Sequence, residues 1–312
     1  MELWQLSLLK GYFRSAGRFA PGLVGRQAFK LCFTPMRRPG VEKTARALLE
    51  RAEDVPVEVE GRRLRVYRWS DQTRPPSGTV LVVHGWDSRA SRMTVWVEPL
   101  LARGFDVVAF DMPAHGDSDG KRTDGLDMAR AVVAAAETVG PLHGVVSHSA
   151  GAFASAMAVA GGHLLGEPAV SAKRLVMVAT VDNPLIHVAG FASVLELSDG
   201  VRDGLLRATA AEFGHPMEDF SLSRIPNGWD QPTLLVHDPE DREVPYTESE
   251  SVAASRPNAT LIPIYGVGHH RIARHARVVS LTADFLTDPD PDWSTRMSAT
   301  EPTYPTNPAT PS

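Results

Sequence analysis

Ser149, Asp241 and His269 are residues whose types and order could together activate an alcohol for attack on a carbonyl carbon. A serine hydroxyl is a weak nucleophile at neutral pH, so it needs a base to take its proton and an acid to orient that base. The chain supplies a serine turn, an acidic turn and a histidine turn in that order, each directly after a short apolar run. This arrangement predicts nucleophilic catalysis through a covalent acyl intermediate.

The serine turn spans residues 147–151 (Ser-His-Ser-Ala-Gly), between an apolar run that ends at 146 and an apolar segment that begins at 152. A reactive serine at a sharp strand-to-helix turn needs small residues two positions before and after it, because the backbone bends tightly there. Gly151 and Ser147 meet this requirement, although glycine is usual at both places. We predict that Ser149 is the nucleophile. The pattern allows His148 to line the substrate pocket and leaves a structural or solvent-facing position open.

The acid and the base each have competitors in the same turn. The acidic turn after the apolar run 234–236 holds three carboxylates: Asp238, Glu240 and Asp241. The distance from the end of the run, and the Val-Pro pair at 244–245, favour Asp241. The turn after the apolar run 261–264 offers two adjacent histidines, His269 and His270.

A glycine-containing turn, residues 84–86 (His-Gly-Trp), follows the apolar run 79–83. We predict that the backbone N–H groups of Trp86 and Ala150 donate hydrogen bonds to the oxyanion of the tetrahedral intermediate. One such donor contributes roughly 3–4 kcal/mol to transition-state stabilisation. The indole ring of Trp86 is expected to form a wall of the pocket. His84 and His115 are expected to make local hydrogen bonds rather than to bind a metal.

The composition is that of an ordinary globular protein. The chain has 312 residues, of which 43% are hydrophobic and 22% charged, and its formal net charge is −5. This charge argues against nucleic-acid binding, which requires a basic surface. Cys32 is the single cysteine, which excludes an intramolecular disulfide and a thiolate zinc cluster and fits a reducing cytoplasm. The predicted chemistry requires no metal and no organic cofactor.

The apolar pattern predicts an α/β fold. Residues 55–60 and 63–69 alternate apolar and polar around Gly61, as in an antiparallel hairpin. Continuously apolar runs, typical of strands buried on both faces of a parallel sheet, follow at 79–83, 107–110, 144–146, 175–178, 233–236 and 261–264. Helical spacing lies between them at 92–103, 125–138 and 150–161. Repeated strand–helix–strand units predict a mostly parallel sheet with helices on both faces.

The chain divides into a core and three additions. The core is expected to comprise residues 51–180 and 231–287. Residues 181–230 between them exceed the length of one crossover and are predicted to form a helical lid over the ligand-binding end of the sheet. Residues 1–50 are expected to form a helical extension, and the Pro-, Thr- and Ser-rich tail 288–312 to be disordered. Two lid residues, Leu185 and Phe191, are expected to face the substrate, with packing inside the lid as the alternative.

Residues 1–30 mix apolar side chains with basic ones: Lys10, Arg14, Arg18, Arg26 and Lys30. They are interpreted as helices packed on the domain, as a basic amphipathic segment on an anionic membrane, or as a secretory signal. The apolar run before Lys10 is short and no A-x-A-like cleavage site follows, which disfavours a signal. We expect a cytoplasmic protein, with at most a weak peripheral membrane contact through residues 1–30.

Together these motifs resemble the α/β-hydrolase family over about residues 55–286. The turn at His84-Gly85 is similar to the family's oxyanion turn, and residues 110–118 resemble its D-x-P-G-H-G-x-S loop, with Ala114 in place of a glycine. Ser149 matches the family's nucleophile, Asp241 its acid before Val-Pro, and His269 the base of G-x-G-H. The resemblance implies that His269, rather than His270, is the base. It also implies an eight-stranded, mostly parallel sheet with a cap inserted after the sixth strand.

The resemblance implies a serine esterase or lipase. Hydrolysis of small or medium apolar carboxylic esters through an acyl-enzyme is the leading expectation, and a small-molecule ester is the expected partner. The same triad also serves lactone and thioester hydrolysis, acyl transfer and perhydrolysis, among which a fold cannot choose. A ligand-binding protein of the same fold without catalysis is the alternative from another class.

Overall fold

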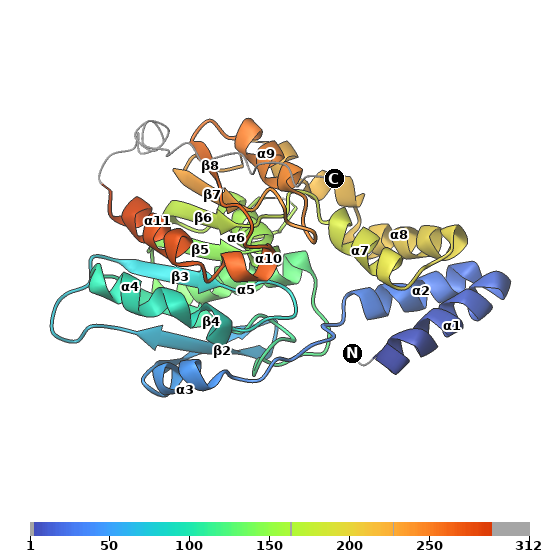
Figure 1. The fold of residues 1–312 in the computed structure, drawn as a ribbon, viewed down its shortest axis with the longest axis horizontal. Coiled ribbons are helices and arrows are strands. Elements are labelled where there is room, and N and C mark those ends of the chain that lie inside the picture. Colours follow the sequence, from blue (N-terminus) through green and yellow to red (C-terminus); the bar gives the residue numbers. More distant parts are fainter. Residues whose placement is uncertain (1–2, 163, 227, 289–312) are drawn as a thin grey trace, which may run out of the picture.

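One mixed sheet forms the centre of the computed structural model, which describes residues 3–162, 164–226 and 228–288 (Figure 1). Its eight strands lie in the order β1-β2-β4-β3-β5-β6-β7-β8. Strand β2 pairs antiparallel with β1 and with β4, and all other neighbours are parallel. The sequence prediction of an eight-stranded, mostly parallel sheet is confirmed. The strands are β1 Glu53–Val59, β2 Arg62–Trp69, β3 Thr79–Val83, β4 Asp106–Phe110, β5 Leu142–His148, β6 Ala172–Val178, β7 Thr233–His237 and β8 Ala259–Pro263.

Helices cover both faces of the sheet, because successive side chains of each central strand point to opposite sides. Leu81 and Val145 join the core that packs under α5 and α6, whereas Val80 and Val146 join the core on the side of α4 and α11. The helices of this part are α3 Lys43–Glu50, η1 Ala90–Trp96 (a 3₁₀ helix), α4 Val97–Ala102, α5 Gly125–Val139, α6 Ala150–Ala160, α9 Tyr246–Ser255, α10 His269–Ile272 and α11 Ala276–Thr287.

Two helix starts have clear local causes. The Asp124 carboxylate accepts hydrogen bonds from the backbone N–H groups of Leu126 and Asp127, both at 2.9 Å, and so caps α5. The helix α6 begins directly after Ser149, which has a φ of 54°.

The single helix expected at 92–103 is wrong in detail: the segment forms η1 and then α4, because its first turn adopts the tighter 3₁₀ geometry.

The insertion between β6 and β7 is helical and meets the N-terminal helices at the end of the molecule away from the sheet (Figure 1). It contains α7 Leu185–Val194, α8 Asp199–Phe213 and the 3₁₀ helices η2 Met217–Phe220 and η3 Leu222–Arg224. The N-terminal helices are α1 Leu3–Phe19 and α2 Pro21–Cys32. The backbones of α2 and α8 touch at Gly25 and Gly204, where a Cβ on either glycine would meet the other helix. The insertion and residues 3–32 therefore form one helical cap.

Two expectations concern residues near the ends of the chain. Apart from Asp288, the tail predicted to be disordered lies outside the described residues. Among the described residues, no helix has both the length and the apolar character needed to cross a membrane.

Candidate active site

Ser149, His269 and Asp241 form a continuous chain of hydrogen bonds at the carboxyl ends of the central strands. The Ser149 Oγ lies 2.9 Å from His269 Nε2. The other ring nitrogen, His269 Nδ1, lies 2.7 Å from Asp241 Oδ2. Ser149 and His269 are buried, and the Asp241 side chain has no exposed surface. With Nδ1 protonated and bonded to the carboxylate, Nε2 is left as an acceptor for the serine proton.

The serine turn is held by close backbone contacts. A Cβ at position 151 would collide with the His84 carbonyl oxygen, so only glycine lets α6 start this close to the end of β3. Ser147, which stands where the family has glycine, donates its hydroxyl hydrogen to the Val176 carbonyl oxygen at 2.9 Å. Because this hydroxyl is satisfied within the sheet, serine is tolerated at the first position of the turn.

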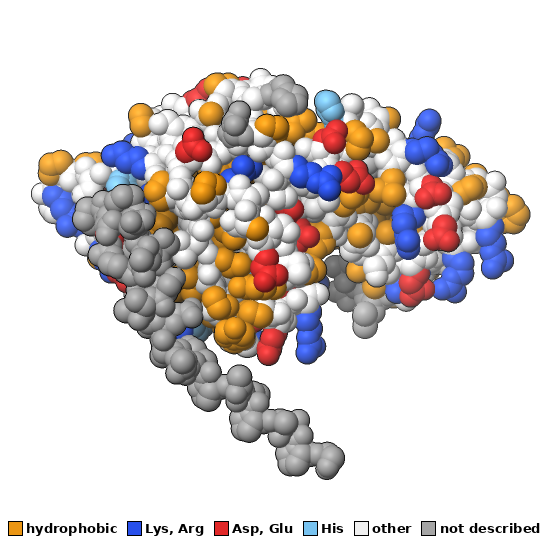
Figure 2. Space-filling view, turned by 90° about the horizontal axis from the view of Figure 1, so that it is seen from above, with side chains coloured by type: hydrophobic (Ala, Val, Ile, Leu, Met, Phe, Trp, Pro, Cys, Tyr) orange, Lys and Arg blue, Asp and Glu red, His pale blue; other side chains and the backbone are white. Residues whose placement is uncertain are grey.

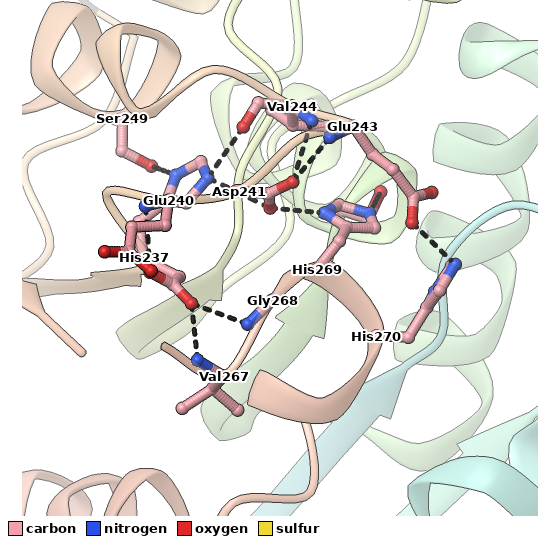
Figure 3. A network of polar contacts seen from close by, with 12 residues as sticks. His237, Glu240, Asp241, Glu243, Val244, Ser249, Val267, Gly268, His269 and His270 are labelled. Carbon is pink, nitrogen blue, oxygen red and sulfur yellow. Dashed lines mark hydrogen bonds and ion pairs between the residues drawn. The ribbon is translucent and has the colours of Figure 1, made fainter. Parts of the chain in front are cut away.

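Four donors surround the Asp241 carboxylate (Figure 3). The backbone N–H groups of Glu243 and Val244 donate to Oδ1 at 2.8 and 3.0 Å, and His269 Nδ1 donates to Oδ2 at 2.7 Å. His237 Nε2 shares its hydrogen between Oδ2 at 3.3 Å and the Val244 carbonyl oxygen at 3.1 Å. Burial alone would raise the pKa of Asp241, but the hydrogen bonds from His237 and His269 outweigh it and lower the pKa below its ordinary value. The carboxylate therefore stays ionised through the neutral pH range and can hold the imidazole of His269 in place.

The competing acids and the competing histidine, all within the described part of the chain, form no hydrogen bond with Ser149 or with the ring of His269, and Figure 3 labels two of them, Glu240 and His270. Asp238 is buried, and its carboxylate accepts hydrogen bonds from the backbone N–H groups of Val267 and Gly268 at 2.6 and 2.5 Å. It thus fixes the loop that carries His269. Glu240 is exposed. His270 is exposed as well and lies 3.1 Å from a Glu243 carboxylate oxygen. Of the alternatives left open by the sequence, Asp241 and His269 are the pair brought to Ser149.

The histidines near the site make local hydrogen bonds. His84 Nε2 accepts from the Met112 backbone N–H at 2.9 Å, and burial lowers its pKa well below the ordinary value. His115 Nε2 accepts from the Asp87 N–H at 3.1 Å.

Ligand atoms of Glu243, His269 and His270 lie within 4.8 Å of one another. A metal there would have to displace Ser149 or Asp241 from the ring nitrogens of His269, so these residues do not fit a metal site.

The two predicted oxyanion donors flank the serine. A Cβ on Gly85 would lie 3.0 Å from the Ser149 Cβ, which places the turn that carries Trp86 directly beside the nucleophile. Ala150 is the first residue of α6. Within the described part of the chain, neither the Trp86 nor the Ala150 backbone N–H donates to another protein group. Both donors are therefore free to bind a developing oxyanion.

A cavity of about 810 Å³ opens over Ser149. Its walls include His148, Trp86 and Phe191, as expected from the sequence. Leu185 is not in the wall, although the sequence analysis placed it there. The cavity-facing positions of α7 follow a helical spacing through Ile186, His187, Gly190, Phe191 and Val194, and Leu185 falls off that stripe.

The sequence model of the alpha/beta hydrolase family matches residues 80–281 of this chain, a range that contains Ser149, Asp241 and His269. The chain belongs to the alpha/beta hydrolase family. The comparison of this chain with curated proteins found no match.

Solved structures share the fold of this alpha/beta hydrolase. The esterase Pf2001 of Pyrococcus furiosus is 21% identical with a TM-score of 0.61, over 81% of this chain and 98% of that one. Est1E of Butyrivibrio proteoclasticus, solved with ferulic acid, is 18% identical with a TM-score of 0.53, over 78% and 99%. A bacterial membrane phospholipase A is 19% identical with a TM-score of 0.56, over 91% and 97%.

Two features of this alpha/beta hydrolase's site were not predicted from the sequence. His237, the last residue of β7, is fully buried, and its Nδ1 lies 2.6 Å from the Ser249 Oγ while Nε2 reaches Asp241. The N-terminal helices also line the cavity, through Leu6, Leu31 and Cys32. The amphipathic spacing of residues 3–32 was a signal for packing, but it did not identify the surface that they pack against.

Removing the donor at position 237 should destabilise the alpha/beta hydrolase. His237→Phe removes the contacts of this imidazole with the Asp241 carboxylate, the Val244 carbonyl oxygen and the Ser249 hydroxyl, and we expect the free energy of unfolding to fall by roughly 2 kcal/mol. Urea unfolding of the wild type and the variant measures this loss. His237→Gln keeps a donor and should lose less. An unchanged midpoint for His237→Phe would show that this histidine does not support the carboxylate.

His148 should make the stability depend on pH. Burial and the neighbouring His269 lower the pKa of His148 to about 3, and its Nε2 donates to the His269 carbonyl oxygen at 2.8 Å. The folded state therefore resists a proton that the unfolded chain binds below about pH 6.5, so stability is complete above that pH and is lost as the pH falls. Denaturant titrations between pH 6 and 4 should show a slope shallower by about 1.4 kcal/mol per pH unit in His148→Gln. Equal slopes in the two proteins would contradict the lowered pKa.

Proposed function

We propose that this alpha/beta hydrolase is a serine carboxylesterase that cleaves small or medium apolar esters through an acyl-enzyme. The observation that carries the proposal is the hydrogen-bonded chain from Asp241 through His269 to Ser149 at the floor of a cavity of about 810 Å³. A cavity of this size is within the range of small-molecule sites.

The geometry supports acylation through a tetrahedral intermediate. His269 Nε2 takes the Ser149 proton as Oγ attacks the ester carbonyl carbon, and the Asp241 carboxylate stabilises the imidazolium that forms. The N–H groups of Trp86 and Ala150 bind the carbonyl oxygen as it becomes negative. When the C–O bond to the alcohol breaks, His269 returns the proton to the departing oxygen.

Deacylation repeats these roles with water. A water molecule gives a proton to His269 and attacks the acyl carbonyl carbon, and the acid leaves as Ser149 regains its proton. In each half-reaction the imidazole of His269 accepts one proton and returns it, so this chain's own residues suffice for both half-reactions.

Apolar side chains in the cavity favour an apolar acyl or alcohol group. Phe153 comes from α6, and Val181, Ile186, Phe191 and Phe220 come from the insertion between β6 and β7. The structural neighbours include an esterase from Pyrococcus furiosus, and Est1E was solved with ferulic acid, a carboxylic acid of the kind that ester cleavage releases. These likenesses agree with ester cleavage.

Filling the cavity should shorten the preferred ester. Gly190 on α7 lines the cavity, and a Cβ there would meet nothing within 4 Å. We expect Gly190→Leu to lower kcat/KM for p-nitrophenyl octanoate roughly 10-fold or more, as for other misfits in apolar pockets, while p-nitrophenyl acetate is cleaved as before.

A matched control for this variant is Gly11→Leu, at a helical glycine that also has open space but does not line the cavity. The control should leave the chain-length profile unchanged. An identical profile for Gly190→Leu would mean that the acyl group binds elsewhere, and the absence of ester cleavage by the wild type across the whole series would refute the proposed activity.

A further inference from the structure

The N-terminal helices carry an exposed apolar stripe on the side opposite to the catalytic cavity. Trp4, Leu8, Tyr12 and Phe19 recur at spacings of four and seven residues along α1, which places them on one face of the helix. Trp4, Leu8 and Phe19, with Leu23 on α2, have between 61% and 89% of their surface exposed. Side chains of this size are normally covered in a globular protein when they form a continuous patch.

The other face of α1 already has its packing partners. Phe13 is buried, Leu6 lines the cavity, and a Cβ on Gly17 would touch Val201 of α8. Figure 1 shows α1 as the outermost helix of the stack that it forms with α2 and α8. The exposed stripe therefore does not serve the packing of the cap.

Positive charge surrounds the stripe. Residues 3–41 contain seven basic residues and no acidic one: Lys10, Arg14, Arg18, Arg26, Lys30, Arg37 and Arg38. Lys10 and Arg14 pair with Glu196, whereas Arg18, Arg26 and Lys30 are exposed. Figure 2 shows this end of the molecule from the side of α8, where Lys and Arg side chains alternate with Asp and Glu side chains.

A shallow groove lies beside the stripe. It has a volume of about 380 Å³ between α2 and α8, and its wall includes Leu23 and two guanidinium groups, those of Arg26 and Arg207. Guanidinium groups bind phosphate oxygens well, and here they adjoin an exposed apolar side chain. That combination matches a phospholipid headgroup with its neighbouring acyl chains.

We propose that the outer face of α1 and α2, defined by Trp4, Leu8, Phe19, Leu23, Arg18 and Arg26, docks on the surface of an anionic lipid bilayer. Apolar and aromatic side chains would enter the interface while the flanking cations bind headgroups. A second copy of the chain fits the face less well, because a two-fold pairing of this face would bring two copies of a segment with seven basic residues and no acidic one together. The docking does not depend on the proposed esterase activity.

Vesicle sedimentation of the full chain tests the proposal. The wild type should bind vesicles of phosphatidylcholine with 30% phosphatidylglycerol, bind pure phosphatidylcholine more weakly, and be released by 0.5 M sodium chloride, because salt screens the cations. Two variants should each lower the partition coefficient at least about 10-fold: Trp4→Ser/Leu8→Ser/Phe19→Ser and Arg18→Glu/Arg26→Glu.

Matched controls lie on other surfaces. Tyr265→Ser removes an exposed aromatic ring and Lys173→Glu reverses an exposed charge, and both should bind vesicles like the wild type. Circular dichroism and cleavage of a soluble ester report folding. If ester cleavage is absent from every protein, the proposed function fails while the vesicle result still stands.

Three outcomes would overturn the proposal. The wild type does not sediment with anionic vesicles, the variants sediment as well as the wild type does, or light scattering shows a wild-type dimer that the apolar variant converts to a monomer. The last result would assign the face to a second copy of the chain.

Discussion

Replacing Ser149 with alanine should lower kcat for ester cleavage on the order of 10⁶-fold, the loss seen when the nucleophile of a serine triad is removed. The variant loses only the Oγ atom that lies 2.9 Å from His269 Nε2, and its backbone keeps the same conformation. We therefore expect the free energy of unfolding to fall by no more than about 1 kcal/mol, the contribution of one side-chain hydrogen bond. Steady-state kinetics with p-nitrophenyl butyrate and urea unfolding measure the two quantities.

Ser147→Ala is the matched control, two positions earlier in the same turn. Its hydroxyl donates to the Val176 carbonyl oxygen and takes no part in the proposed chemistry. We expect this variant to lose about 1 kcal/mol of stability while it retains activity. Normal turnover by Ser149→Ala, or a loss of turnover confined to Ser147→Ala, would contradict the assignment of the nucleophile.

Replacing Asp241 with asparagine should lower kcat roughly 10⁴-fold. The asparagine carbonyl can replace only one of the two carboxylate oxygens, so the amide NH₂ group faces the donors on His237 and His269. His269 is then driven to the tautomer with the proton on Nε2, where it cannot accept the proton of Ser149. Kinetics at pH 8 measure the loss.

Asp238→Asn is the control for this variant. Asp238 accepts hydrogen bonds from the loop before His269 and does not touch the imidazole. Its replacement should cost stability, with a much smaller effect on kcat in the folded protein. Comparable kcat values for the wild type and Asp241→Asn would show that the carboxylate is not the orienting acid.

Stability at acid pH gives Asp241 a second readout. Its pKa is lowered in the folded state, so the carboxylate contributes stability that is complete above its unfolded pKa of about 3.9 and is lost as the pH falls below that value. Asp241→Asn removes this group, so the variant should show a smaller decline of unfolding free energy between pH 4 and 3. An equally steep decline would mean that the lowered pKa is not a property of this carboxylate.

The geometry of the candidate site was largely predictable, because Ser149, Asp241 and His269 each lie in a short turn after a buried strand. The apolar runs are local patterns in the sequence, and parallel strands bring their carboxyl ends to one edge of the sheet. The choice between Asp241 and Asp238 rested on spacing, and the structure gives its physical basis: Asp238 binds loop N–H groups, whereas Asp241 reaches the imidazole.

The cap was less predictable. The helix α7 is apolar on all sides, so its sequence does not reveal which face meets the cavity, and Leu185 was assigned to the wrong face. The contact between Gly25 and Gly204 joins segments far apart in the chain, and no periodicity encodes such a contact. For the same reason the contribution of Leu6 and Leu31 to the cavity required the structure.

Labelling with a fluorophosphonate distinguishes an activated Ser149 from an inert one, because the reagent reacts with a serine only when its hydroxyl is activated. Peptide mass spectrometry of the native protein should show one adduct, on Ser149, that is absent from Ser149→Ala and strongly reduced in Asp241→Asn. A folded native protein that is labelled only at another residue would show that Ser149 is not the nucleophile, and one that takes up no label would favour a ligand-binding protein without catalysis.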